Sequence, residues 1–320
     1  MKTKFILIAV ILMLAGGVFL LLPKMAGIRG ADGKDSRTVS AGELQDGHTG
    51  NNLSALHKNI PSGPGANPPG NTLSLPPNDL VTEAMQSGDE EQVLTACFAQ
   101  YKETNPETVG IITIPGTVLC HPLMKSKSNE GFYLNHDLLG NRNSNGVPFL
   151  SRSSRLNKPG SNAVIYGHNI RYGAKDVFYP LSGYEKLDYY LAHPLIEIYG
   201  EGGKEEYLVF AYYLVDTADE DAFVYWEKTS FDAQSDFEQY LTEVERRNWL
   251  KTSVPTGAED EYITLSSCSM ELAHSGTNRM VVMARKIRPG EEPEDYLEEA
   301  CLNTHPYLPK KLRTDAYNIY

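Results

Sequence analysis

A cysteine and an arginine lie near each other in the sequence, at the ends of two segments with strand character. Aromatic, β-branched and apolar residues make up Tyr262–Leu265, which leads to Cys268, and the run Met280–Ala284 directly follows Arg279. Strands so close in sequence are expected to be neighbours, with the thiol and the guanidinium at one rim. A thiol attacks as its thiolate, so a base or a positive neighbour would make this cysteine a nucleophile.

A candidate base follows another strand pattern. Residues Asn162–Tyr166 lead through Gly167 to His168, and two strand-terminal residues far apart in the chain can meet at one rim of a barrel. The predicted roles are therefore nucleophile for Cys268, base for His168 and oxyanion or carbonyl binding for Arg279. Each residue alone is commonplace, and the three in this order are more specific.

The other histidines are assigned to structure. His274 is the nearest rival base, but its place beside Ser275 and Gly276 indicates a solvated loop residue. His136 is expected to be structural. His121 and His193 precede prolines, which predicts turn positions for both.

Composition and cysteine spacing exclude several classes of function. The 320 residues are 41% hydrophobic, typical of a globular protein, and the net charge of −12 lacks the basic footprint of a nucleic-acid-binding protein. The cysteines lie far apart, with no Cys-x-x-Cys pair and no histidine at metal-ligand spacing. We therefore predict no nucleic-acid partner, no disulfide framework, no metal and no cofactor.

The first 78 residues are predicted to lie outside the folded domain. The apolar run from Phe5 to Leu22 has the length of a short membrane span, and no A-x-A-like cleavage site follows it, so residues 1–25 are interpreted as an uncleaved anchor rather than a signal peptide. Lysines and arginines flank both sides, so charge alone leaves the orientation open. Residues 26–78 are rich in Gly, Ser, Asn and Pro and are expected to form a flexible linker.

The folded domain is expected over residues 79–287, followed by a polar, proline-rich tail at 288–320 with a possible short helix up to Cys301. Helical spacing predicts one or two helices between Leu80 and Tyr101, and a capping box at Ser235–Glu238 predicts another helix before the cysteine strand. Further patterns indicate a helix at 184–192 and short strands at 109–114, 147–150, 163–166, 195–199 and 207–215. So many short strands favour a mainly β barrel or sandwich over a parallel α/β sheet.

Several of these segments resemble the sortases. The run Thr264–Cys268 followed by Arg279 is similar to the family's T-L-x-T-C…R signature, and Tyr166–Asn169 is similar to its catalytic-histidine segment. The helix inserted before the cysteine strand and the N-terminal helices resemble class B in particular. The likeness extends over residues 105–114, 132–137 and 177–181.

The sequence departs from the family pattern at a few positions. Ser267 stands where threonine is usual and keeps the hydroxyl. Ile111 replaces a common tryptophan, and Cys120–Pro122 stands where tyrosine-proline is usual; both are interpreted as packing changes. The acidic tail after Arg288 is longer than class B domains typically carry.

The resemblance implies a closed β-barrel of about eight strands and a transpeptidase. Cys268 would cleave an NPxTG-like C-terminal sorting motif of secreted proteins, giving a thioacyl enzyme that a peptidoglycan amine resolves. His168 would act as acid and base, Arg279 would position the motif and stabilise the oxyanion, and Asn129 and Ser267 would contact substrate. Motif preference would depend on the excursion from Asp216 to Lys251. The implied location is the outer face of the cytoplasmic membrane of a Gram-positive bacterium.

The sequence also allows two other interpretations, a papain-like protease and a non-enzymatic surface protein. A papain-like protease also pairs cysteine with histidine, but there the cysteine comes first and opens a helix, whereas here His168 precedes Cys268. The non-enzymatic alternative is a membrane-anchored receptor or adhesin with a β-barrel head and an inert Cys268.

Overall fold

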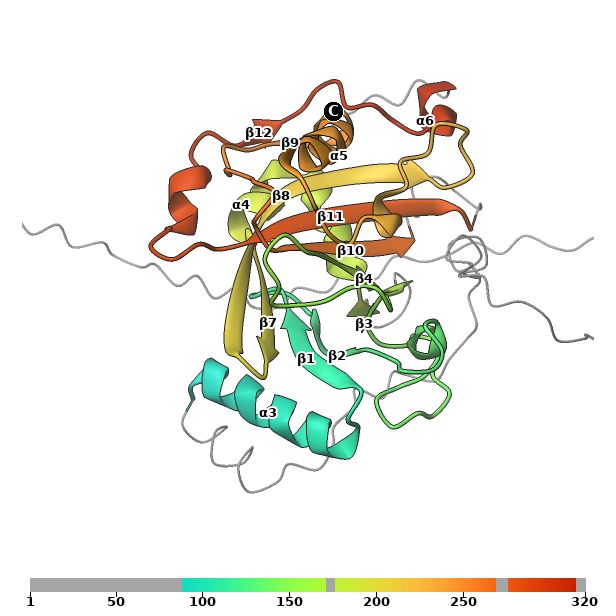
Figure 1. Cartoon of the computed structure of the whole chain (residues 1–320), viewed down its shortest axis with the longest axis vertical. Helices are drawn as coiled ribbons and strands as arrows, with labels where there is room; N and C mark the ends of the chain where they lie inside the picture. The colour runs from blue at the N-terminus through green and yellow to red at the C-terminus, as the bar shows by residue number, and fades with distance from the viewer. Residues whose placement is uncertain (1–87, 171–175, 269–275, 315–320) are drawn as a thin grey trace, which may run out of the picture. The chain divides into compact units, whose positions relative to one another are not determined.

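A closed β-barrel is the centre of the fold (Figure 1). The computed structural model describes residues 88–170, 176–268 and 276–314, and within them the barrel order is β1-β2-β3-β4-β10-β11-β8-β7. Neighbouring strands are antiparallel except for the parallel pairs β2–β3 and β4–β10. This confirms the predicted closed barrel of about eight strands. Its strands are β1 (Thr108–Thr113), β2 (Cys120–Met124), β3 (Phe149–Leu150), β4 (Asn162–Tyr166), β7 (Leu195–Gly200), β8 (Gly203–Asp216), β10 (Tyr262–Cys268) and β11 (Asn278–Lys286).

Helices and two small sheets surround the barrel. Helix α3 (Glu90–Thr104) packs on β1 and β7, with Asp89 capping its first turn. Helix α4 (Leu187–Ala192) follows a 3₁₀ helix, and α5 (Gln234–Arg247) precedes the cysteine strand as predicted. The remaining elements are α6 (Lys310–Thr314), the pairs β5 (Asn169–Ile170) with β6 (Asp176–Val177) and β9 (Leu250–Lys251) with β12 (Cys301–Leu302), and 3₁₀ helices at Phe132–Leu134, Tyr179–Glu185, Tyr225–Glu227 and Pro293–Tyr296.

Alternation along the strands divides most of the buried core between two large clusters. On β10, Ile263 and Leu265 belong to one cluster, whereas Tyr262 belongs to the other, together with Phe237 and Tyr240 of α5. This follows from the period of two, which sends successive side chains to opposite faces of a sheet. The stacked rings of Phe237 and Tyr262, with centroids 5.6 Å apart, attach α5 directly to the cysteine strand.

Three local expectations were wrong. The capping box is absent from α5, because the helix begins at Gln234 with Ala233 as its N-cap, which places Ser235 inside the first turn. His121 lies on β2 rather than in a turn, where its Nε2 is 2.7 Å from Asp176 Oδ1. Before Cys301 the tail forms only the short 3₁₀ helix Pro293–Tyr296, and Cys301 itself is in β12.

The predicted membrane anchor precedes the first described residue. Residues 5–22 and the helical pattern before residue 88 lie outside the described residues. No helix within the described ranges is both long enough and apolar enough to span a bilayer.

Candidate active site

The parallel pairing of β4 with β10 brings the predicted histidine and cysteine to one rim. Tyr166 and Ser266 are partners in this pair. Beyond them the Gly167 N–H donates to the Ser266 carbonyl (3.3 Å), and the Asn169 amide donates to the Cys268 carbonyl (3.2 Å). Because the segments that follow β4 and β10 continue side by side, His168 and Cys268 lie at the same level of the rim. This backbone register supports the prediction that the two residues meet at one end of the barrel.

Arg279 lies directly opposite Cys268 across the antiparallel pair of β10 and β11. Its Nη1 is 3.9 Å from Cys268 Sγ and also donates to the carbonyls of Gly276 (2.9 Å) and Asn278 (2.8 Å). The side chain is only 1% exposed, so these carbonyls hold the guanidinium in place beside the sulfur. A fixed positive charge in a poorly solvated position stabilises a thiolate or an oxyanion more strongly than one in water.

Burial and the charge of Arg279 shift the pKa of the Cys268 thiol in opposite directions. Burial raises the pKa of the Cys268 thiol, and the charge of Arg279 lowers it by a smaller amount, so the net pKa lies above its ordinary value. A thiol with a raised pKa is neutral near pH 7, and a base would be needed to form its thiolate.

The surroundings of His168 determine its pKa and its tautomer. Burial lowers its pKa, the hydrogen bond to Leu134 opposes this shift, and Arg279 adds to it, so the net pKa is below the ordinary value and the imidazole is neutral at pH 7. Its Nε2 is 2.9 Å from the Leu134 carbonyl oxygen. A carbonyl only accepts hydrogen bonds, so Nε2 carries the proton and the lone pair is on Nδ1.

Two glycines make this arrangement possible. A Cβ on Gly167 would lie 2.7 Å from the ring of Phe178, whose backbone N–H donates to the His168 carbonyl. Gly146 has a φ of +58°, and a Cβ there would lie 2.4 Å from the Leu134 carbonyl oxygen. Side chains at these positions would displace the histidine or its acceptor.

Ser267 and Asn129 make hydrogen bonds within the protein. The Ser267 hydroxyl, 1% exposed, donates to the Gly167 carbonyl at 2.7 Å and thereby ties β10 to the histidine segment. Asn129 is exposed, and its Oδ1 accepts from the Gly131 N–H at the start of the 3₁₀ helix that ends at Leu134. Substrate contact by either residue stays a prediction.

His136 and His193 have structural contacts. His136 stacks on Phe132 with ring centroids 4.0 Å apart, and His193 Nδ1 is 2.9 Å from the Pro115 carbonyl. His274 lies outside the described residues. In the described part of the chain, no three His, Cys, Asp or Glu side chains gather as a metal site.

Sequence reasoning did not identify three groups that support the site. The Leu134 carbonyl orients His168, the Asn169 amide holds the Cys268 backbone, and the Tyr225 hydroxyl lies 2.7 Å from Ser266 Oγ. Asn169 was visible as the neighbour of the histidine. A backbone acceptor has no side-chain signature, and Tyr225 reaches the strand only through the tertiary fold.

Comparison with known proteins identifies the family. The sortase domain model matches residues 112–287. Sortase B of Staphylococcus aureus is 30% identical over 190 residues, covering 59% of this chain and 74% of that protein, and sortase B of Listeria monocytogenes is 29% identical over 186 residues, covering 58% and 72%.

Solved structures agree with this result. A Staphylococcus aureus sortase B–substrate complex has 28% identity and a TM-score of 0.55 and covers 66% of this chain and 92% of that chain. Clostridium perfringens sortase B has 28% identity and a TM-score of 0.52, with 59% and 99% covered. These matches do not favour the receptor alternative. The chain belongs to the sortase family of cell-wall-sorting cysteine transpeptidases, and its relatives are of class B.

Proposed function

We propose that Cys268 is the nucleophile, His168 the proton carrier and Arg279 the oxyanion-binding group of this transpeptidase. The observation that supports the proposal best is the position of Cys268 in two strand pairs. Arg279 is its direct partner on one side, with Nη1 3.9 Å from the sulfur, and the histidine segment runs in register on the other.

In the first half-reaction, His168 Nδ1 takes the thiol proton as Cys268 Sγ attacks the carbonyl carbon of the scissile peptide bond. The tetrahedral oxyanion forms beside the Arg279 guanidinium, which compensates its charge. When the C–N bond breaks, His168 returns the proton to the leaving amine and a thioester remains.

The second half-reaction mirrors the first. An incoming amine attacks the thioester carbon and gives its proton to His168, a new C–N bond forms, and the C–S bond breaks. The departing thiolate then recovers the proton from the imidazolium. The proton that enters with the amine thus ends on the cysteine, so the enzyme is regenerated.

The proposed donor substrates are secreted proteins with an NPxTG-like C-terminal sorting signal, and the proposed acceptor is a peptidoglycan amine. Solved sortase B structures in complex with a substrate and with triglycine support both halves of this proposal. Asn129 and Ser267 are proposed to contribute to substrate binding, Ser267 through the position it gives to the cysteine strand.

Domain organisation and membrane attachment complete the proposal. Residues 1–25 would anchor the chain, 26–78 would form a linker, 79–287 the catalytic domain and 288–320 a tail. The apolar run from Phe5 to Leu22 supports the anchor. As an enzyme of the Gram-positive cell wall, the domain would face outward from a single N-terminal span.

Cleavage of a fluorogenic NPxTG-like peptide, with and without an added amine, tests the proposal. Cys268→Ala should abolish both hydrolysis and aminolysis. The matched control is Cys120→Ala, because Cys120 is an exposed cysteine on β2 that should not affect turnover. Full activity of the Cys268 variant would rule out the mechanism.

The same assay decides between the two candidate bases. His168→Ala should lose nearly all activity, whereas His274→Ala should keep most of it. The reverse result would assign the proton transfer to His274.

A further inference from the structure

The C-terminal tail packs against the folded domain and passes along α5 toward the active-site rim. Its strand β12 pairs with β9, and the Asn303 N–H then donates to the Trp249 carbonyl (2.8 Å) and the Tyr307 N–H to the Arg246 carbonyl (2.8 Å). Leu312 is 5% exposed and belongs to the same core cluster as Leu214 of β8. We call residues 303–313 the C-terminal strap.

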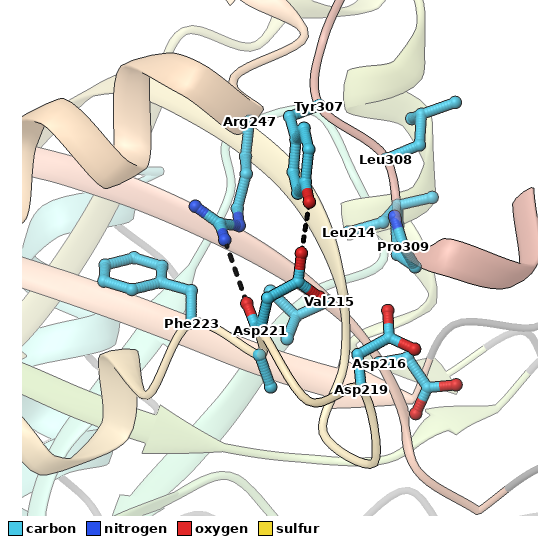
Figure 2. Close-up of a pocket in the computed structure, with 11 residues that line it drawn as sticks. Leu214, Val215, Asp216, Asp219, Asp221, Phe223, Arg247, Tyr307, Leu308 and Pro309 are labelled. Atoms are coloured by element: carbon cyan, nitrogen blue, oxygen red, sulfur yellow. Dashed lines mark hydrogen bonds between the residues drawn. The ribbon is translucent and has the colours of Figure 1, made fainter. Parts of the chain in front are cut away.

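The strap ends on the segment that leaves β8 beside the active site, residues 216–224, which we call the rim segment. Tyr307 donates its hydroxyl to Asp221, and the Lys310 N–H at the start of α6 donates to Asp219 Oδ2 at 2.8 Å. Arg247 of α5 adds a hydrogen bond to the Asp221 carbonyl (3.3 Å) (Figure 2). The strap thus holds the middle of the rim segment at two carboxylates.

Both ends of the rim segment are attached to the catalytic strands. At its start, Val215 of β8 is the partner of Arg279, and the Thr217 N–H donates to the Thr277 carbonyl (3.0 Å). Past its end, the Tyr225 hydroxyl contacts Ser266. The rim segment is therefore held at both ends by the strands that carry Arg279 and Cys268, and its middle is held by the strap.

Tyr307 is the central residue of the strap. Its ring lies between guanidiniums, with the Arg246 carbon 3.5 Å and the Arg313 carbon 4.4 Å from the centroid. Arg313 Nη1 also donates to its hydroxyl (2.6 Å), and Arg313 Nη2 is 3.5 Å from Asp221 Oδ2. The tyrosine therefore links α5, the end of the strap and the rim segment.

The space between strap and rim segment is too small for a ligand. Figure 2 shows Tyr307 and Arg247 pointing toward Asp221 there, and the cavity has a volume of about 10 Å³. That is the space of one water molecule.

The rim segment also presents an apolar side chain to solvent. Val224 is 42% exposed and directly precedes Tyr225, which touches the cysteine strand. An exposed apolar residue next to a tyrosine that contacts the cysteine strand is suited to contact a bound peptide.

We propose that the C-terminal strap is a positioning element of the active site, in which Tyr307, through Asp221, holds the rim segment in the place that peptide binding requires. The inference rests on the proposed function only for its kinetic consequence. Tyr307 touches neither Cys268 nor His168 and is not a catalytic residue.

Hydrogen exchange of the full chain tests the positioning without any activity. Tyr307→Ala should speed exchange of amides in residues 216–224 and leave those of β10 unchanged. Tyr307→Phe keeps the ring between the arginines but loses the bond to Asp221, and should give a smaller effect. The matched control is Tyr296→Ala, which removes a tail tyrosine that bonds to Glu291 instead. Unchanged exchange in the rim segment of the Tyr307→Ala variant would overturn the proposal.

Kinetics test the consequence. Tyr307→Ala should raise KM for the sorting peptide about tenfold, while kcat and the rate of Cys268 alkylation by iodoacetamide stay near wild type. A parallel fall in kcat, alkylation rate and melting temperature would show general destabilisation and overturn the proposal. Failure of the wild-type enzyme to cleave the peptide would instead count against the proposed function, and the hydrogen-exchange result would still decide on the strap.

Discussion

Strand β11 carries a buried arginine near each end, and the two are used differently. Arg279 at one end donates to main-chain carbonyls and lies beside the Cys268 thiol, whereas Arg285 at the other end makes a bidentate pair with Glu291 at 2.8 and 3.1 Å. Both side chains are 1% exposed or less. One positive charge therefore lies beside the proposed nucleophile, and the other is paired with a carboxylate.

This difference shows how a barrel can separate activity from stability along a single strand. Removing one partner of a buried ion pair destabilises the fold, because the other charge is left buried and uncompensated. A guanidinium 3.9 Å from a thiol lies where an attack by that thiol would place a developing oxyanion. Substitutions at the two arginines should therefore have opposite profiles.

The largest expected effect is on activity at the catalytic end. Arg279→Ala should lower kcat/KM for the sorting peptide by about 10² to 10³, the usual cost of losing an oxyanion-binding donor. Its unfolding midpoint should change much less than that of an Arg285 variant. Peptide kinetics and urea unfolding of the same preparation measure both quantities, and unchanged kcat/KM would remove Arg279 from the mechanism.

At the other end the effect should be on stability. Arg285→Ala should reduce the free energy of unfolding by about 3 kcal/mol, because it breaks a buried ion pair and leaves Glu291 without its bidentate partner. At a temperature where the variant is folded, kcat/KM should be near wild type. A large loss of turnover in fully folded protein would contradict the separation of roles.

The pH dependence sharpens the comparison further. Burial lowers the pKa of His168 and raises that of Cys268, so kcat/KM should follow a bell whose acid limb lies below the ordinary histidine value and whose basic limb lies above the ordinary cysteine value. Between the two limbs His168 is neutral and Cys268 is protonated, so the thiol can give its proton to the imidazole.

Arg279 lowers both of these pKa values, so its removal should move both limbs to higher pH. Arg279→Gln provides the test, and Arg279→Lys is the control that retains the charge. Limbs that stay fixed in the glutamine variant would show that Arg279 does not act on the pair electrostatically.

The smallest effect is expected at Ser267. Ser267→Ala removes the donor to the buried Gly167 carbonyl and should cost about 1 to 2 kcal/mol of stability. Ser267→Thr keeps the hydroxyl and should remain near wild type. Equal losses in the two variants would indicate that packing, rather than the hydrogen bond, determines this position.

The sequence predicted the barrel because the evidence for it is local. Alternating runs such as Tyr262–Leu265 bury one face, and their number favoured a barrel or sandwich. The closed form came from the resemblance to sortases, as did class B. The site residues were found for a similar reason, since cysteine, histidine and arginine each have a distinctive side chain at a strand end.

What the sequence did not reveal depends on long-range contacts. The strap has no apolar periodicity, and Tyr307 acquires its role only when Arg246 and Asp221 surround it. The Leu134 carbonyl is an acceptor that any residue would provide. Ser235 is not the cap because α5 begins two residues earlier than a Ser235 cap requires, at Gln234 with Ala233 as the N-cap.

The parallel pairing of β4 with β10 also bears on when the enzyme becomes active. The two strands are separated by α4, α5 and two barrel strands, and parallel contacts of such high sequence separation form slowly because a long loop must close first. A folding intermediate that is ordered only up to α5 contains His168, but β10 with Cys268 has not yet paired with β4. Activity should therefore appear during refolding with the slowest phase of barrel closure, later than most of the helical signal.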